Sequence, residues 1–122
     1  MTSDNPNPKR ILAIVANGAM AEIIPAMLGY AEYKCDSAYE HKAILRMLRR
    51  ANKYDLVICH VAALEKEEKF YSWALRTKIP IISFAARPLN GVPEVIRERC
   101  IFLQVPFERE QLLAVVRGIF GG

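Results

Sequence analysis

The sequence predicts an α/β fold in three layers: a five-stranded, parallel, doubly wound sheet with helices on both of its faces. Short apolar runs alternate with segments of helical periodicity five times along the 122 residues. Three of these runs are apolar throughout, which is typical of strands that are buried on both faces. Strict alternation of strand and helix favours right-handed crossovers between parallel strands.

The first strand is predicted over residues 10–16 and is followed by a turn signal at Asn17 and Gly18. A helix follows over residues 20–29, in which Pro25 predicts a kink or a late start. The apolar residues of this helix share one face: Met20, Ile23, Ile24, Met27 and Leu28.

The second strand is predicted over residues 31–35 and leads into a helix over residues 37–51. Asp36 or Ser37 is the expected N-cap of this helix, because short polar side chains bond the free amides of a first turn. The third strand lies within Y-D-L-V-I-C-H-V-A, residues 54–62, a dense apolar run that contains a cysteine and a histidine near its end.

The second half of the chain continues the alternation. In order, it predicts a helix over 63–76, a strand over 79–85, a loop over 87–91, a helix over 92–99, a strand over 100–105 and a helix over 107–120. The residues expected on the buried faces of the first and last of these helices are Leu64, Phe70, Trp73, Ala74, Leu75, Leu112, Leu113, Val116 and Ile119.

Composition places the chain among soluble single domains. Apolar residues make up 52% of it and charged residues 25%, and no apolar run is long enough to span a membrane. Residues 1–8 are expected to form a flexible leader that is not a secretory signal, which leaves 9–120 as the domain. The three cysteines form no C-x-x-C pair, so no zinc or thioredoxin-type site is indicated, and a cytoplasmic location is expected.

The net charge of +4 is mild, and arginines gather within residues 46–50 and 97–99. We interpret both clusters as solvated helix faces. A nucleic-acid surface is the alternative. No aromatic residues interleave with the arginines and no groove-binding motif is present, so direct binding of nucleic acid is not expected.

Four segments, taken in their order and spacing, resemble the response-regulator receiver domain. They are K-R-I-L-A-I-V, K-Y-D-L-V-I-C-H-V, I-P-I-I-S-F-A-A-R and L-Q-V-P-F-E-R-E-Q-L-L, and the resemblance spans residues 9–120. It implies the CheY-like, flavodoxin-like form of the sheet, with a site at the carboxyl ends of the first, third, fourth and fifth strands. A working receiver there holds Mg²⁺ with an acidic pair and accepts phosphate on an aspartate, aided by a hydroxyl and a lysine.

This sequence departs from the receiver pattern at every one of those positions. The acidic pair falls on Val15 and Ala16, or on Ala16 and Asn17, the acceptor on His60, the hydroxyl on Ala85 and the lysine on Val105. The aromatic position whose rotamer reports phosphorylation falls on Phe102. The resemblance therefore implies a pseudo-receiver that is not an enzyme, needs no cofactor and binds no Mg²⁺.

Receiver domains commonly pair through the face of their fourth helix, fifth strand and fifth helix. Here these elements are the helix over 92–99, the strand over 100–105 and the helix over 107–120. A protein partner or a second copy is expected on this face, in signalling or at the start of a transcription regulator. The candidate interface residues are Arg97, Arg99, Phe102, Gln104, Arg109, Val115 and Arg117.

Two alternatives stay open. In the first, the chain is a small enzyme or anionic-ligand binder that uses Asn17, Gly18, His60 and Arg87 at the strand ends. His60 itself is expected to fill a vacated pocket and to bond a backbone carbonyl, with a phosphate acceptor or pH sensor as the alternative. Pairing of Cys59 with His60 is disfavoured, because adjacent strand residues point to opposite faces.

Overall fold

The computed structural model describes residues 8–60, 68–85 and 94–121, so most of the predicted leader lies outside the described residues. Strands and helices alternate as predicted. The elements are β1 (Arg10–Ile14), α1 (Gly18–Gly29), β2 (Lys34–Ala38), α2 (His41–Leu48), the short 3-10 helix η1 (Ala51–Lys53), β3 (Leu56–His60), α4 (Glu68–Arg76), β4 (Ile81–Ala85), α5 (Glu94–Arg99), β5 (Cys100–Gln104) and α6 (Arg109–Phe120).

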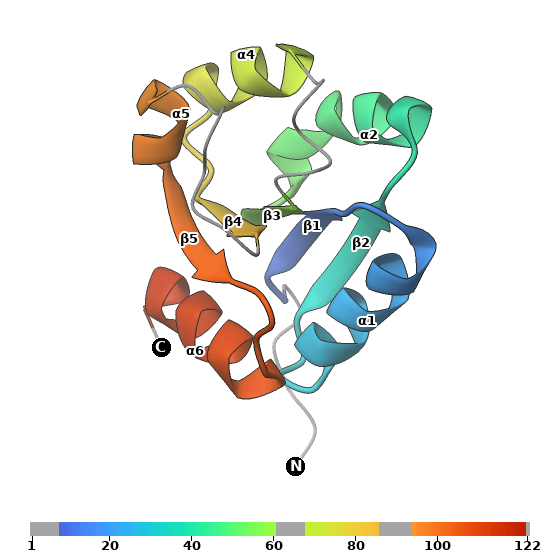
Figure 1. Ribbon diagram of the computed structural model, residues 1–122, viewed down its shortest axis with the longest axis vertical. Helices are drawn as coiled ribbons and strands as arrows, with labels where there is room; N and C mark the ends of the chain where they lie inside the picture. The colour runs from blue at the N-terminus through green and yellow to red at the C-terminus, as the bar shows by residue number, and fades with distance from the viewer. Residues whose placement is uncertain (1–7, 61–67, 86–93, 122) are drawn as a thin grey trace.

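All neighbouring strands are parallel, and the sheet order is β2-β1-β3-β4-β5 (Figure 1). This is the doubly wound order predicted from the sequence. The three central strands are buried along almost their whole length, while β2 and β5 form the two edges. The continuous apolar runs thus mark the central strands, as expected for strands covered on both faces.

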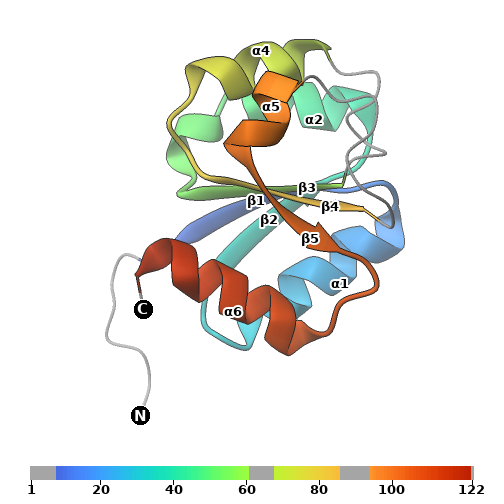
Figure 2. The same cartoon turned by 60° about the vertical axis from the view of Figure 1, so that its left-hand side comes forward.

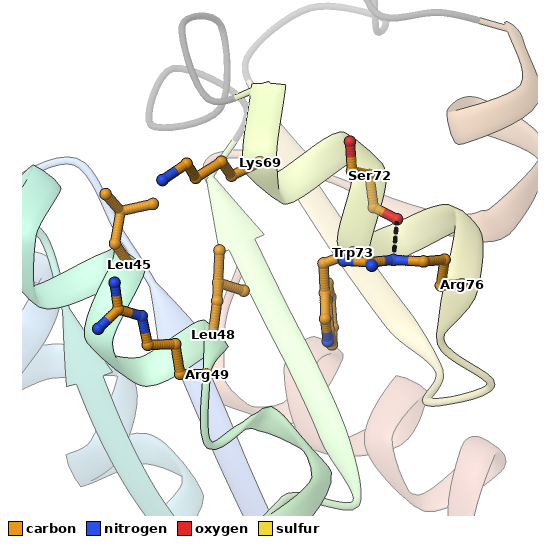
Figure 3. A pocket seen from close by; sticks show the side chains of 7 residues that line it. All are labelled: Leu45, Leu48, Arg49, Lys69, Ser72, Trp73 and Arg76. Atoms are coloured by element: carbon orange, nitrogen blue, oxygen red, sulfur yellow. Dashed lines mark hydrogen bonds between the residues drawn. The ribbon is translucent and has the colours of Figure 1, made fainter.

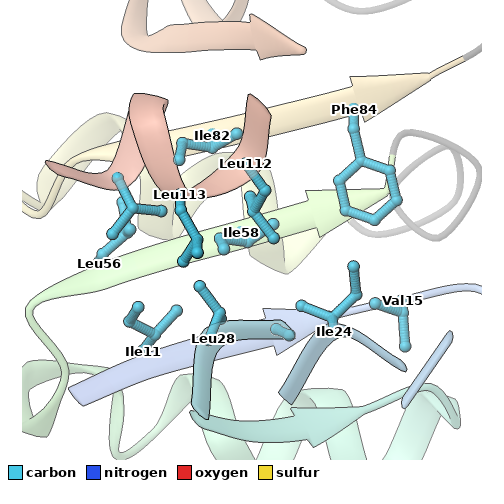
Figure 4. Close-up of a cluster of buried hydrophobic side chains, with 12 residues drawn as sticks. Ile11, Val15, Ile24, Leu28, Leu56, Ile58, Ile82, Phe84, Leu112 and Leu113 are labelled. Atoms are coloured by element: carbon cyan, nitrogen blue, oxygen red, sulfur yellow. The ribbon is translucent and has the colours of Figure 1, made fainter. Parts of the chain in front are cut away.

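Helices cover both faces of the sheet, with α1 and α6 on one side and α2, α4 and α5 on the other (Figures 1 and 2). Successive residues of β1 serve the two layers in turn, since Ile11 packs toward α1 and α6 while Leu12 packs toward the opposite helices. Figure 4 shows the first layer, in which Leu28 of α1 and Leu112 of α6 close over the sheet.

The second strand begins three residues later than predicted. Residues 31–33 complete the end of α1 instead: the amides of Ala31 and Tyr33 bond the Leu28 carbonyl, and Glu32 takes a left-handed conformation with φ 63°. Asp36 and Ser37 consequently lie within β2, so neither is the N-cap of α2. That position belongs to Glu40, whose side chain makes no capping bond.

Pro25 lies inside α1 without ending it, and a partner on β2 explains how. A proline has no amide hydrogen, so the carbonyl four residues earlier, that of Ala21, loses its helical donor. The Ser37 hydroxyl of β2 donates to this carbonyl at 2.8 Å. The prediction of a late start is wrong, because α1 already begins at Gly18, and the neighbouring strand replaces the hydrogen bond that Pro25 removes.

Two predictions about helix faces are also wrong. Ile23 in α1 is 50% exposed and Leu75 in α4 is 54% exposed, whereas Ile24 and Ala74 beside them are buried. Ile24 and Ala74 were predicted on the same faces, so each buried face is narrower than predicted and excludes the residue at its margin.

Candidate functional site

The end of β1 carries hydrocarbon and capping groups. Val15 is completely buried, its amide donates to the Ala38 carbonyl at 2.9 Å, and its side chain lies in the apolar layer with Ile24 and Phe84 (Figure 4). Ala16 follows on the exposed side. Neither residue offers a carboxylate at this end of the sheet.

Asn17 is the N-cap of α1 and Gly18 is its first residue, so the turn signal at these two positions marks the start of the helix. The Asn17 carboxamide oxygen accepts from the Met20 amide at 2.9 Å. An anion at the start of α1 would have to compete with this bond, because the Met20 amide is one of the few free donors of a first turn.

His60 ends β3 in contact with aromatic side chains. Its ring meets Phe84 edge-on at 5.0 Å between centroids, and Phe84 in turn meets Phe107 at 5.6 Å and 80°. Phe84 is completely buried. The row from His60 to Phe107 therefore fills the ends of β3 and β4 with packed rings.

The imidazole of His60 does not make the carbonyl bond that the sequence suggested. Its Nδ1 atom is buried and has no hydrogen-bond partner within the described residues. Burial lowers the pKa of His60 below its ordinary value, because the charged form loses hydration. The ring is accordingly neutral at neutral pH.

Cys59 faces the opposite side of the sheet from His60's aromatic row. Its sulfur lies 3.3 Å from the Ser83 hydroxyl oxygen and 3.5 Å from the Ile82 carbonyl oxygen, deep in the layer that α2 and α4 cover. Burial raises the pKa of the Cys59 thiol. The residue is thus a protonated core side chain, not the partner of His60 in a nucleophilic pair.

Ala85 ends β4, and Val105 directly follows β5. They are half-buried, and the Val105 amide donates to the Ala85 carbonyl at 2.9 Å. Arg87 and the segments that follow His60 and Ala85 lie outside the described residues. The described strand ends thus bring together Val15, His60, Ala85 and Val105, four residues without an ionised oxygen or an ammonium group.

Magnesium does not fit these side chains. Mg²⁺ takes oxygen ligands in octahedral geometry, and carboxylates usually supply the protein's share of them. Across residues 8–60, 68–85 and 94–121, no group of three or more His, Cys, Asp or Glu residues is placed to hold a metal. Asp55 lies at the other end of β3, where its carboxylate accepts from the Arg10 amide at 2.9 Å.

The face of α5, β5 and α6 is different, because β5 is an exposed edge. Ile101 is 45% and Phe102 39% exposed, and Val95 on α5 is exposed as well. The predicted interface residues Arg97, Gln104 and Arg117 are exposed, and Val115 is half-buried against the α1/α6 layer.

Two of the predicted interface arginines are already engaged within the domain. The Arg99 guanidinium donates to the Thr77 and Ile79 carbonyls at 2.9 and 3.0 Å. The Arg109 guanidinium lies 3.8 Å from the centre of the Tyr30 ring and donates to Glu110 at 2.9 Å. Ile101 and Val95 were missed. Once β5 is known to be an edge strand, its apolar sequence indicates that some of its apolar residues, such as Ile101, are exposed.

Two of the surface hollows in the described part of the chain are not lined by Asn17, Gly18 or His60. One lies beyond β5 at Pro106 and Phe107, and the other between α2 and α4. None of the described helices is long and apolar enough to cross a membrane.

Solved response-regulator receiver domains share this fold. A receiver domain protein from Bacillus halodurans matches with a TM-score of 0.74 at 15% identity, over 93% of this chain and 97% of its own. The N-terminal domain of a response regulator/sensory box/GGDEF protein from Carboxydothermus hydrogenoformans matches with a TM-score of 0.75 at 18% identity, over 93% and 94%.

A third match is the receiver domain of a sensor histidine kinase from Pseudomonas aeruginosa, which has a magnesium ion coordinated in its active-site cleft. Its TM-score is 0.69 at 20% identity, over 95% of this chain and 100% of its own. No protein-family model and no curated protein matches the sequence. The likeness is one of fold, and it agrees with the CheY-like architecture predicted from the sequence.

Proposed function

We propose that this chain is a pseudo-receiver: a signalling module with the receiver fold that acts through protein–protein contact and without phosphoryl transfer. The observation that carries the proposal is the set of residues at the strand ends. By the resemblance to receivers, the acidic pair falls on Val15 and Ala16 or on Ala16 and Asn17, and the acceptor, hydroxyl and lysine positions fall on His60, Ala85 and Val105. Val15 is completely buried and is thus part of the hydrophobic core.

Phosphoryl transfer to a side chain depends on positioning and on charge neutralisation. A metal ion and cations must offset the charge that spreads over the phosphoryl oxygens. The described strand ends offer rings and methyl groups instead, and the His60–Phe84–Phe107 row occupies the space beside the acceptor position. This supports a scaffold role and gives no support to a catalytic one.

The output surface in this proposal is the face of α5, β5 and α6. It combines exposed apolar side chains on an edge strand with exposed arginines, as many protein interfaces do. A second copy of this chain or another protein would bury Ile101 and Phe102 there. Two-component-type signalling or transcription regulation is the setting that the fold suggests by analogy.

Intact mass spectrometry after incubation with acetyl phosphate and Mg²⁺ tests the proposal. We expect the mass to stay unchanged, while a receiver domain with a complete acidic pair and acceptor gains a phosphoryl group under the same conditions. Spectra are recorded without acid treatment, so that a phosphohistidine would survive. The variant His60→Asp is expected to stay unmodified too, because one carboxylate does not rebuild the cation site. A phosphoryl adduct on the wild type would refute the proposal.

The alternative of a small enzyme or anionic-ligand binder has less support. The Asn17 side chain is occupied in capping α1, and His60 lines neither of the two described hollows. A binding site usually gathers several polar groups in one concave pocket. Within the described residues, the strand ends do not show that arrangement.

A further inference from the structure

A groove runs between α2 and α4, on the outer side of one helical layer (Figure 3). Its volume is about 370 Å³, which is room for a few side chains. Leu45 and Leu48 of α2 face Trp73 of α4 across it. All three are half-buried, so the groove has an apolar floor that is only partly covered by the rest of the domain.

Trp73 is held in place from behind. Its ring lies 5.5 Å from that of Phe70, which is completely buried in the layer under the helices. Packing of this kind restricts the indole and leaves its outer part toward the groove. A fixed, half-covered tryptophan is a common anchor point in protein interfaces.

The rim of the groove is positively charged on both walls. Arg49 follows α2, while Lys69 and Arg76 belong to α4, and all three side chains are exposed. The Arg76 Nε atom donates to the Ser72 carbonyl at 3.2 Å, which leaves the other guanidinium donors available. In the part of the chain that the structure describes, none of the three forms an ion pair, and no acidic residue lines the groove.

We propose that this groove docks a short acidic segment of a partner protein. One or two large apolar side chains of the segment would pack on Leu48 and Trp73, and its Asp or Glu residues would meet the cations of the two walls. Charge complementarity argues for the negative partner, since the described charged residues that line the groove, Arg49, Lys69 and Arg76, are all positive. The apolar floor argues for hydrophobic side chains rather than a purely polar chain.

The geometry favours a peptide over a compact anion. A site for a small anion usually directs buried donors or backbone amides at one point. Here the cations are exposed and lie on opposite walls of an open groove. They suit carboxylates spread along a segment, and rim charges of this kind chiefly steer association.

This proposal goes beyond the pseudo-receiver role and rests on another surface. The groove lies on α2 and α4, whereas the output surface lies on α5, β5 and α6. Either proposal can fail while the other holds, and a variant of Phe102 separates them experimentally.

Selection of short random peptides displayed on phage, with the whole chain as bait, provides probes. We expect the enriched peptides to be negatively charged and to carry at least one large apolar residue. Binding of a synthetic enriched peptide is then measured by tryptophan fluorescence, which reports on the groove directly because Trp73 is the single tryptophan of the chain. The affinity should fall as salt rises.

Two double variants with the same change in charge form the matched comparison. Arg49→Glu with Arg76→Glu should weaken peptide binding at least about tenfold. Arg46→Glu with Arg50→Glu changes two exposed arginines next to the groove that do not line it, and should leave the affinity within about twofold, as should Phe102→Ala. Arg49→Ala with Arg76→Ala replaces the first variant if charge reversal prevents folding.

Three results would overturn the proposal. The enriched peptides could be neutral or basic, or no peptide could be enriched. The groove variant could bind as tightly as the wild type. Finally, adenosine monophosphate could change the Trp73 fluorescence while acidic peptides do not, which would make the groove a site for a small anion.

Discussion

The two edges of the sheet differ in what they offer to solvent (Figure 1). On β2, the exposed side chains are the charged Lys34 and Asp36. On β5, exposed positions include the apolar Ile101 and Phe102. Edge strands invite pairing with other chains, and charged side chains are a common defence. The β2 edge has that defence and the β5 edge lacks it.

Cross-links to other elements reinforce the contrast. Asp36 accepts from the Tyr54 hydroxyl at 2.5 Å and lies 4.0 Å from the Arg10 guanidinium, while Ser37 bonds α1. Near the β5 edge, Arg99 at the end of α5 bonds the Thr77 and Ile79 carbonyls just before the strand begins. The β2 edge is thus bonded to other elements of the domain, whereas the β5 edge presents apolar side chains to solvent.

The largest effect is expected from making β5 as polar as β2. Ile101→Ser with Phe102→Ser should weaken self-association at least about thirtyfold, because truncating two interface anchors commonly costs about 2 kcal/mol or more. Sedimentation over a concentration series measures it, with Lys34→Ser at the opposite edge as the control. Association of the β5 variant at wild-type strength, or a wild type that is monomeric throughout, would contradict the self-dimer.

The second prediction concerns how β5 is held at its start. Arg99→Ala removes two charge-assisted bonds to the Thr77 and Ile79 carbonyls and should lower the free energy of unfolding by about 2 kcal/mol. Arg97→Ala, on the same helix but exposed, should change it by less than about 0.5 kcal/mol. Urea unfolding compares the two, and equal effects would show that Arg99 is not an anchor.

On the β2 side, Tyr54→Phe should cost about 1 kcal/mol by removing the bond to Asp36. Burial first, and then this bond, raise the pKa of Tyr54 above its unfolded value of about 10. The folded state therefore keeps the proton longer than the unfolded state. The stability from Tyr54 is complete below that pH and is lost as pH rises toward the folded pKa. The difference in unfolding free energy between the wild type and Tyr54→Phe should shrink as the pH is raised into the alkaline range. A constant difference would argue against this.

The smallest measured quantity is a coupling energy, expected where β2 bonds α1. Ser37→Ala should cost about 1 kcal/mol, because the Ala21 carbonyl loses its donor. In a Pro25→Ala background the cost should fall by about half, since residue 25 then has an amide for the same carbonyl. A double-mutant cycle from denaturant unfolding measures the coupling. Additive costs would mean that the serine does not compensate for the proline.

The central strands and β5 could be predicted from sequence, and the start of the other edge strand, β2, could not. Runs such as Leu56–His60 are apolar throughout, and that signal arises only when both faces are covered. The short K-C-D-S-A of β2 has no such signal, because an edge strand with polar exposed positions resembles a turn. Its start was therefore placed too early, at residues that finish α1.

The hydrogen-bond partners of side chains were harder to predict than the positions of residues in the fold. The sequence places His60, Ala85 and Val105 at strand ends, because a parallel sheet brings those ends together. It does not show that Arg99 bonds two carbonyls that lie 22 and 20 positions away, before β4, or that Ser37 replaces an amide of α1. Such bonds depend on tertiary distances that no local pattern encodes.

Within the described residues the buried Nδ1 of His60 has no hydrogen-bond partner, so protonation of this ring should loosen the end of the sheet. Burial lowers the pKa of His60 in the folded state. The stability that the neutral ring contributes is therefore complete above the unfolded pKa of about 6.5 and is lost as the pH falls through the folded pKa. In the proposed pseudo-receiver, acid sensitivity would thus reside in His60, on which the resemblance places the phosphate acceptor.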